Sequence, residues 1–338
     1  MKFGPAPVND AIGCVLAHSV EAGLPPYSTQ MSYRIRKGTV ITAAHVADLT
    51  AEGRETLIVA QLDPTDMDED TAAATLGAAL IAGHSGLYLS QAATGRVNVF
   101  AAHAGVATID VAAIAAFNAI NPMITVATVL PFQRMDADGM VATIKIIAYG
   151  VPRTDVDRAA GIGGAFGLAA PRYASATLIE TRIDQRATLP DKGRHVTQDR
   201  IARFGMQLSP RVVVDHDVDT LAKAIMTAQG DMILILTGSA TSDPMDVGPE
   251  ALRRAGGTVT RFGMPVDPGN LLFIGALGGK PVIGLPGCAR SPALNGADWI
   301  LERVICGIPL GADDIAAMGV GGLLKEIPTR PRPRNTKV

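Results

Sequence analysis

The second half of the chain alternates between short apolar runs and amphipathic segments. The apolar runs are rich in β-branched and aliphatic residues and predict strands, while the periodic segments predict helices over 196–205 and 218–228. The predicted strands cover residues 176–180, 211–215, 231–236, 258–264, 271–274 and 281–285. Regular alternation of this kind predicts α/β architecture, with a mainly parallel sheet between two helical layers, a three-layer α/β/α domain.

The first 160 residues show a less regular pattern, which is typical of an α+β domain. Helices are predicted over 43–53, with Thr42 as the N-cap, and over an alanine-rich run that follows the acidic segment 66–70. Predicted strands lie at 55–60, 97–100 and 140–147. No cluster of catalytic residue types appears here, so the role of this part stays open.

A glycine-rich segment, GIGGAFG at 161–167, separates the two patterns. A dinucleotide-binding loop needs a strand before it and a helix after it. Here the charged segment 153–158 precedes the glycines and Pro171 follows them, which favours a linker. We therefore expect an N-terminal domain over 1–160, an α/β domain over 170–310, and a C-terminal extension over 311–338. The extension ends in PTRPRPRNTKV, a basic, proline-rich sequence that predicts a flexible tail.

Composition narrows the classes of function. The formal net charge is -2 and aromatic residues make up 4%, which excludes a binder that covers nucleic-acid phosphates or stacks on bases. The three cysteines, Cys14, Cys288 and Cys306, are too scattered for a disulfide framework. No apolar run of about 20 residues free of charge is present, so no membrane span is expected. We expect a cytoplasmic protein.

Two loops of the α/β domain are candidate ligand-binding sites, because parallel sheets bind ligands at the carboxyl ends of their strands. The loop after Leu236 combines a glycine with hydroxyl residues that suit phosphate oxygens, and Pro249 is predicted as the first residue of the next helix. A plain surface turn is an equal alternative. The loop after Leu285 contains Ser291 and Pro292, which predict the start of a helix that runs to Cys306. Its alternative is a simple strand-to-helix connection.

The order of motifs from residue 231 to 292 resembles the molybdopterin-binding domain shared by molybdopterin adenylyltransferases and molybdopterin molybdotransferases. The matching motifs are TGSAT at 237–241, Asp246, GGTV at 256–259, PG at 268–269, GGKPV at 278–282 and LPG at 285–287. Asp267 and Asn270 stand where that family has lysines. The resemblance is nearest to bacterial molybdopterin-binding proteins that occur alone or joined to a molybdenum cofactor nucleotidyltransferase.

The resemblance implies a pterin ligand, molybdopterin, and a set of site residues. Asp246 matches the functional aspartate of the family and would be the catalytic residue and a Mg²⁺ ligand, with Asp243 as a second metal ligand. Arg290 either replaces some of the charge of the missing lysines, lies at the rim of the site, or pairs with an acidic helix end. The residues implied for cofactor binding are Thr237, Gly238, Ser239, Thr241, Ser242, Pro286, Gly287, Cys288 and Arg290.

Three functions remain open on this basis. The first is Mg²⁺-assisted transfer at the phosphate or dithiolene of molybdopterin, in the manner of a molybdotransferase or adenylyltransferase. The second is a non-catalytic carrier that hands the cofactor to a nucleotidyltransferase or an apo-enzyme, which the loss of the lysines favours. The third is a phosphohydrolase acting on another pterin or nucleotide. We expect a homo-oligomer, either a dimer or a trimer, with a nucleotidyltransferase as a partner.

Two weaker candidates lie outside these loops. Asp215, His216 and Asp217 form a possible metal triplet, but alternation on an extended backbone points His216 away from both carboxylates, and Asp217 or Asp219 suits the cap of the following helix. Asp184 lies where molybdotransferases have an acidic residue after a strand.

Overall fold

The computed structural model describes residues 1–23, 32–186 and 188–324, so the tail predicted at the C-terminus lies outside the described residues. The chain divides into two compact units. The first combines Met1–Ala102 with Ala107–Leu168, and the second combines His103–Val106 with Ala169–Val338.

The first unit begins with a small antiparallel sheet. Its strand order is β1 (Lys2–Pro7), β5 (Thr56–Gln61) and β2 (Val15–Leu16), and β3 (Val20–Ala22) pairs with β4 (Tyr33–Ile35) beside it. Helix α1 (Ala43–Ala51) begins at Thr42, whose hydroxyl accepts the amide of His45. The predicted cap is therefore confirmed. A short 3₁₀ helix, η1 (Val8–Asp10), places Val8 in the same apolar core as Leu16.

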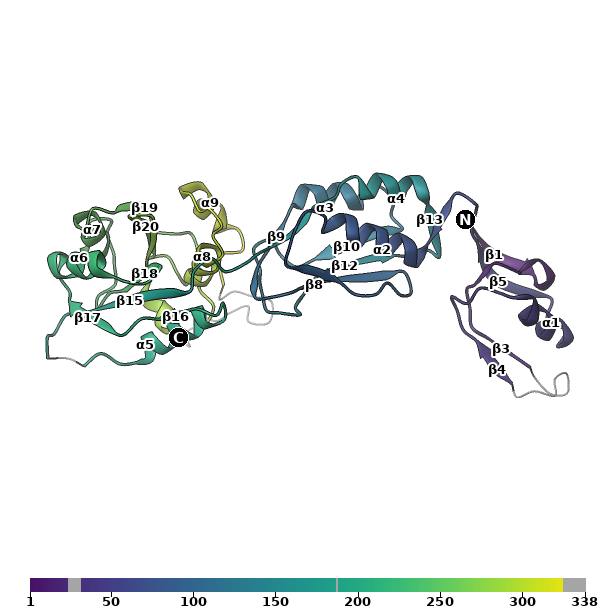
Figure 1. Ribbon diagram of the computed structural model, residues 1–338, viewed down its shortest axis with the longest axis horizontal. Helices are drawn as coiled ribbons and strands as arrows, with labels where there is room; N and C mark the ends of the chain where they lie inside the picture. The colour runs from purple at the N-terminus through teal and green to yellow at the C-terminus, as the bar shows by residue number, and fades with distance from the viewer. Residues whose placement is uncertain (24–31, 187, 325–338) are drawn as a thin grey trace, which may run out of the picture. The chain divides into compact units, whose positions relative to one another are not determined.

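A four-stranded antiparallel sheet forms the larger part of this unit. Figure 1 shows helices α2 (Glu69–Leu80), α3 (Val111–Asn118) and α4 (Arg153–Ala160) along one side of it. The predicted helix after the acidic segment is confirmed, because the Asp68 carboxylate caps α2. The strand order in this sheet is β10 (Ile124–Thr128), β12 (Met140–Ile146), β8 (Arg96–Ala101) and β7 (Leu87–Leu89). A separate two-stranded sheet pairs β6 (Asp66–Asp68) with β13 (Gly150–Pro152). A three-stranded sheet has the order β11 (Arg134–Met135), β9 (Gly105–Ile109) and β14 (Phe166–Ala169).

The glycine-rich segment connects a helix to a strand. Helix α4 ends at Ala160 with Gly161 as its C-cap, and β14 begins at Phe166. A dinucleotide loop needs the opposite order, strand and then helix. The chain passes from the first unit to the second between Leu168 and Ala169.

The second unit is built on a seven-stranded sheet, which is mainly parallel as predicted. The strands β16, β17 and β18 pair in parallel with β15, and β18 pairs in parallel with β21. Only β20 and β19, at one edge, run antiparallel. The strands are β15 (Ser175–Arg182), β16 (Gln207–Leu208), β17 (Val212–Asp215), β18 (Met232–Leu236), β19 (Thr258–Phe262), β20 (Phe273–Leu277) and β21 (Lys280–Gly284).

Helices cover both faces of this sheet, and alternation along the strands assigns each face its core. In β15, Leu178 packs with α5 (Lys192–Ala202) and α8 (Gly296–Ile305), while Ile179 packs with α6 (Val218–Thr227) and α7 (Val247–Arg254). Strand β18 is buried along its whole length, which explains why it appears in the sequence as a continuous apolar run. The three-layer α/β/α prediction is confirmed.

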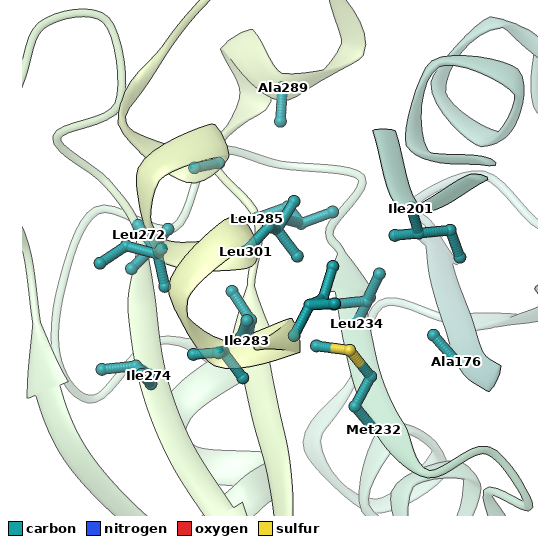
Figure 2. Close-up of a cluster of buried hydrophobic side chains, with 14 of the residues drawn as sticks. Ala176, Ile201, Met232, Leu234, Leu272, Ile274, Ile283, Leu285, Ala289 and Leu301 are labelled. Atoms are coloured by element: carbon teal, nitrogen blue, oxygen red, sulfur yellow. The ribbon is translucent and has the colours of Figure 1, made fainter. Parts of the chain in front are cut away.

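The core under α5 and α8 is the larger of the two. Figure 2 shows Leu234 and Ile283 from adjacent strands beneath Leu301 of α8, with Ile201 of α5 beside them. Burying an aliphatic side chain of this size stabilises the fold by about 1.5–3 kcal/mol. The short helix α9 (Ala312–Ala316) and the 3₁₀ turn η3 (Ala317–Gly319) add Ile315 and Met318 to the same core.

Candidate functional site

The two loops singled out in the sequence lie at the same edge of the sheet. Ile179 of β15 pairs with Ile235 of β18, which pairs with Gly284 of β21, so the three strands end together. Arg290 Nη2 donates to the carbonyl oxygen of Thr237 over 2.7 Å. One hydrogen bond therefore joins the loop after β18 to the turn after β21.

The loop after β18 uses two of its hydroxyls to hold itself together. The Thr237 hydroxyl donates to the carbonyl oxygen of Ser239 and lies 3.3 Å from the Thr241 hydroxyl, and both threonines are buried. Ser239 and Ser242 are exposed. Of the predicted hydroxyl residues, only these two serines face solvent, where a ligand can reach them.

Gly238 lets this loop pass against the end of β15. A Cβ atom at this position would lie 2.8 Å from the carbonyl oxygen of Thr181 and 3.4 Å from the Cα of Arg182. The Gly238 amide donates to the Thr181 hydroxyl over 2.7 Å. The glycine is thus required by packing between the loop and β15, which is a structural reason that the sequence interpretation lacked.

Asp246 is the N-cap of α7. Its Oδ1 accepts the amide of Val247 over 2.7 Å and its Oδ2 accepts the amide of Ser242 over 3.0 Å. The prediction that Pro249 is the first residue of this helix is wrong, because the Asp246 carboxylate starts the helix two residues earlier, at Val247.

The carboxylates predicted to bind Mg²⁺ also accept hydrogen bonds from amides of the loop. Both oxygens of Asp246 hold backbone amides, and Oδ1 of Asp243 accepts the amide of Met245 over 2.7 Å. Among the described residues, no group of three or more His, Cys, Asp or Glu side chains could hold a metal ion. Mg²⁺ is often bound by one or two carboxylates together with substrate phosphates, so the site expected at Asp246 and Asp243 stays a prediction.

The turn after β21 differs from the prediction. Pro286 precedes a 3₁₀ helix, η2 (Gly287–Arg290), which contains Cys288 and has Ser291 as its C-cap. The prediction that Ser291 and Pro292 open the next helix is wrong. Helix α8 begins at Gly296, because Asn295 caps it and the Asp298 carboxylate accepts the Asn295 amide over 2.8 Å.

A buried arginine that the sequence interpretation missed holds this turn. Arg200 Nε donates to Oδ1 of Asp298 over 2.6 Å, and both side chains are only 7% exposed. Its remaining nitrogens donate to the carbonyl oxygens of Ala289, Ser291 and Ala293. Arginine within a predicted helix is usually an exposed residue, so the pattern gave no signal for this contact.

A cavity of about 150 Å³ lies beside the loop junction. Arg290 is the one predicted site residue that lines it, and burial lowers the pKa of its guanidinium while the nearby Glu180 acts in the opposite sense. The other lining residues come from the end of β15, the end of β18 and the segment that opens α5, and they are Glu180, Leu189, Pro190, Lys192, Gly193 and Leu236.

The weaker candidates have structural roles. Asp217 caps α6 by accepting the amide of Thr220 over 2.9 Å, which confirms the capping interpretation. Asp215 pairs with Arg182 over 3.1 Å, and His216 Nδ1 lies 2.8 Å from the Thr181 hydroxyl. The triplet therefore does not converge on one point.

Two family models match the chain. A domain of unknown function, DUF8806, matches residues 5–61, and a model described as "Probable molybdopterin binding domain" matches residues 175–304. The second match covers the sheet from β15 to β21 and most of α8, including both loops of the site. Residues 175–304 therefore form a domain of the molybdopterin-binding family, of the type found in molybdenum cofactor biosynthesis, as the sequence predicted.

Three solved structures are distantly similar to the chain. The molybdopterin biosynthesis MoeA protein from Pyrococcus horikosii is 12% identical, with 93% of this chain and 75% of that chain covered and a TM-score of 0.28. Molybdenum cofactor biosynthesis protein B is 16% identical, with 41% and 96% covered and a TM-score of 0.30. A CinA protein of unknown function from Thermoplasma acidophilum is 19% identical, with 40% and 99% covered and a TM-score of 0.28. No curated protein matches the chain.

Proposed function

We propose that this protein binds molybdopterin, or a molybdenum- or nucleotide-linked form of it, during molybdenum cofactor biosynthesis. The observation that carries the proposal is the junction formed by Arg290. Its guanidinium lines the cavity and donates to the Thr237 carbonyl, at the meeting point of the two loops whose motifs resemble the family. A half-buried cation that is bonded to a loop carrying two exposed serines suits the phosphate of the ligand.

The chemistry of the cavity supports the same ligand class. Leu189, Pro190 and Leu236 provide apolar walls for a flat heterocycle, and Lys192 adds a second cation beside Arg290. Gly193 lets two of the lining side chains pack closely against α5, because a Cβ there would lie 2.9 Å from Leu236 Cδ2 and 3.3 Å from Arg290 Cγ and would displace them.

Binding of molybdopterin to Arg290→Gln and Gly193→Ala tests the proposal. The bound pterin is released by denaturation after gel filtration and measured by its fluorescence. We expect each variant to bind at least about tenfold more weakly than the parent, a loss of about 1.4 kcal/mol. Arg254→Gln is the matched control, because the Arg254 side chain is 59% exposed and lies on α7. Equal binding by the parent and the two site variants would place the ligand elsewhere.

A carrier role is the second candidate, and the geometry of Asp246 favours it over transfer chemistry. A carboxylate that already accepts two backbone amides is used to build the loop. Transfer at the phosphate or dithiolene would show as turnover of molybdopterin with molybdate or a nucleotide in the presence of Mg²⁺. A carrier instead shows binding without turnover and passes its ligand to an added nucleotidyltransferase.

The partner and the assembly are also proposals. A separate molybdenum cofactor nucleotidyltransferase is the partner that this ligand requires, and co-elution of the two proteins in the presence of molybdopterin is the measurement. A homo-oligomer, dimer or trimer, is tested by light scattering.

Within residues 1–23, 32–186 and 188–324, every helix is too short or too polar to span a bilayer.

A further inference from the structure

One face of the four-stranded sheet in the first unit is turned away from its helices. Figure 1 shows α2, α3 and α4 along the other side of this sheet. Val97 and Val99 of β8 face those helices and are buried in the core that they share with Leu76 of α2. Alternation turns Asn98 and Phe100 to the outer face. An outer face of an antiparallel sheet is ordinarily polar.

Three large apolar side chains instead form a row across this outer face. Tyr88 of β7 pairs in register with Phe100, and Phe100 pairs with Met140 of β12. Directly paired residues of antiparallel strands share a face. The rings of Tyr88 and Phe100 stack with their centroids 5.5 Å apart, and Met140 is 48% exposed. We call these three residues the aromatic row.

A β-bulge turns Met140 into this row. Ile146, Ile144 and Ala142 alternate along β12 and are buried on the helical side, so unbroken alternation would bury Met140 there too. The register between β12 and β8 shifts between Met140 and Ala142. Bulges of this kind re-aim side chains, and this one places an apolar side chain where the core of the unit does not use it.

A second apolar pair lies at the other end of the same face. The Ile147 amide donates to the Met123 carbonyl oxygen over 2.8 Å and so continues the pairing of β10 with β12. Their neighbours, Ile124 and Ile146, are buried on the helical side. Alternation therefore turns Met123 and Ile147 outward, and Ile147 is 57% exposed. Exposed apolar patches at both ends of one face mark a protein contact.

The charges on this face differ in sign between its two ends. Arg96 is exposed and pairs in register with Lys145, in the row next to Ile147. Beside the aromatic row, the exposed Asp138 accepts the Tyr88 hydroxyl over 2.8 Å. One end of the face is therefore basic and the other is acidic.

The neighbouring charges already have partners. Lys145 lies 3.9 Å from Glu69, and the Arg134 guanidinium is paired with Asp136. The Arg96 guanidinium and the Asp138 carboxylate therefore dominate the charge of the two ends.

We propose that this outer face is a homodimer interface, on which a second copy of the chain packs with its strands reversed. A two-fold axis across the strands brings the aromatic row of each copy over the Met123 and Ile147 end of the other. The same rotation places Asp138 of each copy at the Arg96 end of the other. Stacking with like ends together would instead set like charges against each other, so charge complementarity selects the reversed arrangement. The two sheets then pack face to face, like the layers of a β-sandwich.

The size of the face suits a reversible dimer. The sheet has four strands, and β12 has seven residues. Spacings of about 4.8 Å between strands and about 3.4 Å between residues give a face of about 400 Å² per copy. Two copies with their protruding side chains then approach the roughly 1,000 Å² of a specific interface. The dimer gives the proposed homo-oligomer an interface and does not depend on the ligand, because the face lies in the first unit and the cavity in the second.

Sedimentation equilibrium of the full-length protein, from micromolar to submillimolar concentration, measures the dimer. We expect a monomer–dimer equilibrium for the parent. Met140→Lys and Ile147→Lys should each raise the dissociation constant at least about tenfold, because each buries a cation in an apolar contact. Met226→Lys is the matched control, since Met226 is 56% exposed on α6 of the second unit, and it should dimerise like the parent. Circular dichroism checks that each variant is folded.

Exchange of the charges tests the orientation. Arg96→Glu should weaken the dimer about tenfold, and Asp138→Lys added to it should restore the dissociation constant to within about threefold of the parent's. A monomeric parent at submillimolar concentration, parent-like dimerisation of both Met140→Lys and Ile147→Lys, or no recovery in the charge-exchanged variant would each overturn the assignment. Monomeric variants should bind molybdopterin like the parent, so failure of the interface is distinct from failure of the proposed function.

Discussion

Replacing Arg200 by methionine should strongly destabilise the second unit. The change removes the partner of the Asp298 carboxylate, which is 7% exposed, and leaves it only the Asn295 amide among the partners described above. It also removes the donors to the carbonyl oxygens of Ala289 and Ser291. Removing one partner of a buried ion pair costs about 3–5 kcal/mol, and we expect the free energy of unfolding to fall by that amount.

Urea unfolding followed by tryptophan fluorescence measures this effect locally. The chain has a single tryptophan, Trp299, which lies on α8 next to Asp298 and packs against the core of the second unit. The midpoint should fall while the slope of the transition stays unchanged. Arg203→Met, an exposed position just after α5, is the control and should change stability by no more than about 0.5 kcal/mol.

A double-mutant cycle separates the ion pair from the rest of the contacts. Asp298→Asn alone should destabilise the unit, and Arg200→Met combined with Asp298→Asn should cost clearly less than the sum of the two single changes, because the double variant leaves no uncompensated buried charge. A loss below about 1 kcal/mol for Arg200→Met, or strictly additive effects, would refute the view that this pair holds the turn after β21.

Three further predictions concern single residues. Asp246→Asn should change stability by a few tenths of a kcal/mol, because asparagine caps helices about as well as aspartate. Unchanged molybdopterin binding across a Mg²⁺ titration would support the capping role, whereas loss of Mg²⁺-dependent binding would support the metal interpretation. Gly238→Val should destabilise the second unit in the same urea assay, since its Cβ would meet the Thr181 carbonyl at 2.8 Å, and parent-like stability would contradict that contact. Burial raises the pKa of Cys306 to about 12 from an ordinary value of 9.0. Native protein should therefore resist alkylation at Cys306 at pH 8.5, and stability should fall as pH rises from 9 toward 12, because the unfolded thiol loses its proton first.

Features fixed by local chemistry were predictable from the sequence. The central strand β18 is buried on both faces, so its apolar run marks it directly. The caps at Thr42 and Asp217 depend on amides three residues away; Thr42 was predicted as a cap, and Asp217 was one of the two candidates given, with Asp219, for the cap of its helix. The position of the two loops followed from the rule that parallel strands present ligands at their carboxyl ends.

Features decided by distant partners were not predictable. Ser291 followed by Pro292 is a good start for a helix when only neighbouring residues are considered. In the folded chain, Arg200, 91 positions away in sequence, binds the Ser291 carbonyl, and the capping box of Asn295 and Asp298 starts α8 later. The error at Pro249 has a local cause instead, because Asp246, three residues before it, caps the helix that begins at Val247.

The same reasoning explains why the cavity was harder to find than the loops. The sequence motifs identify residues by their own type, and they led to Arg290, Thr237 and Asp246. Apart from Arg290, the residues that line the cavity belong to no motif and are brought together by the fold, as Glu180 is at the end of an otherwise apolar row of β15. Its signal in the sequence is one polar residue at the end of a predicted buried strand, where alternation calls for an aliphatic side chain. In the folded chain this carboxylate pairs with Arg211, 31 positions away in sequence, so its place in the cavity wall depends on a contact that alternation along one strand does not reveal.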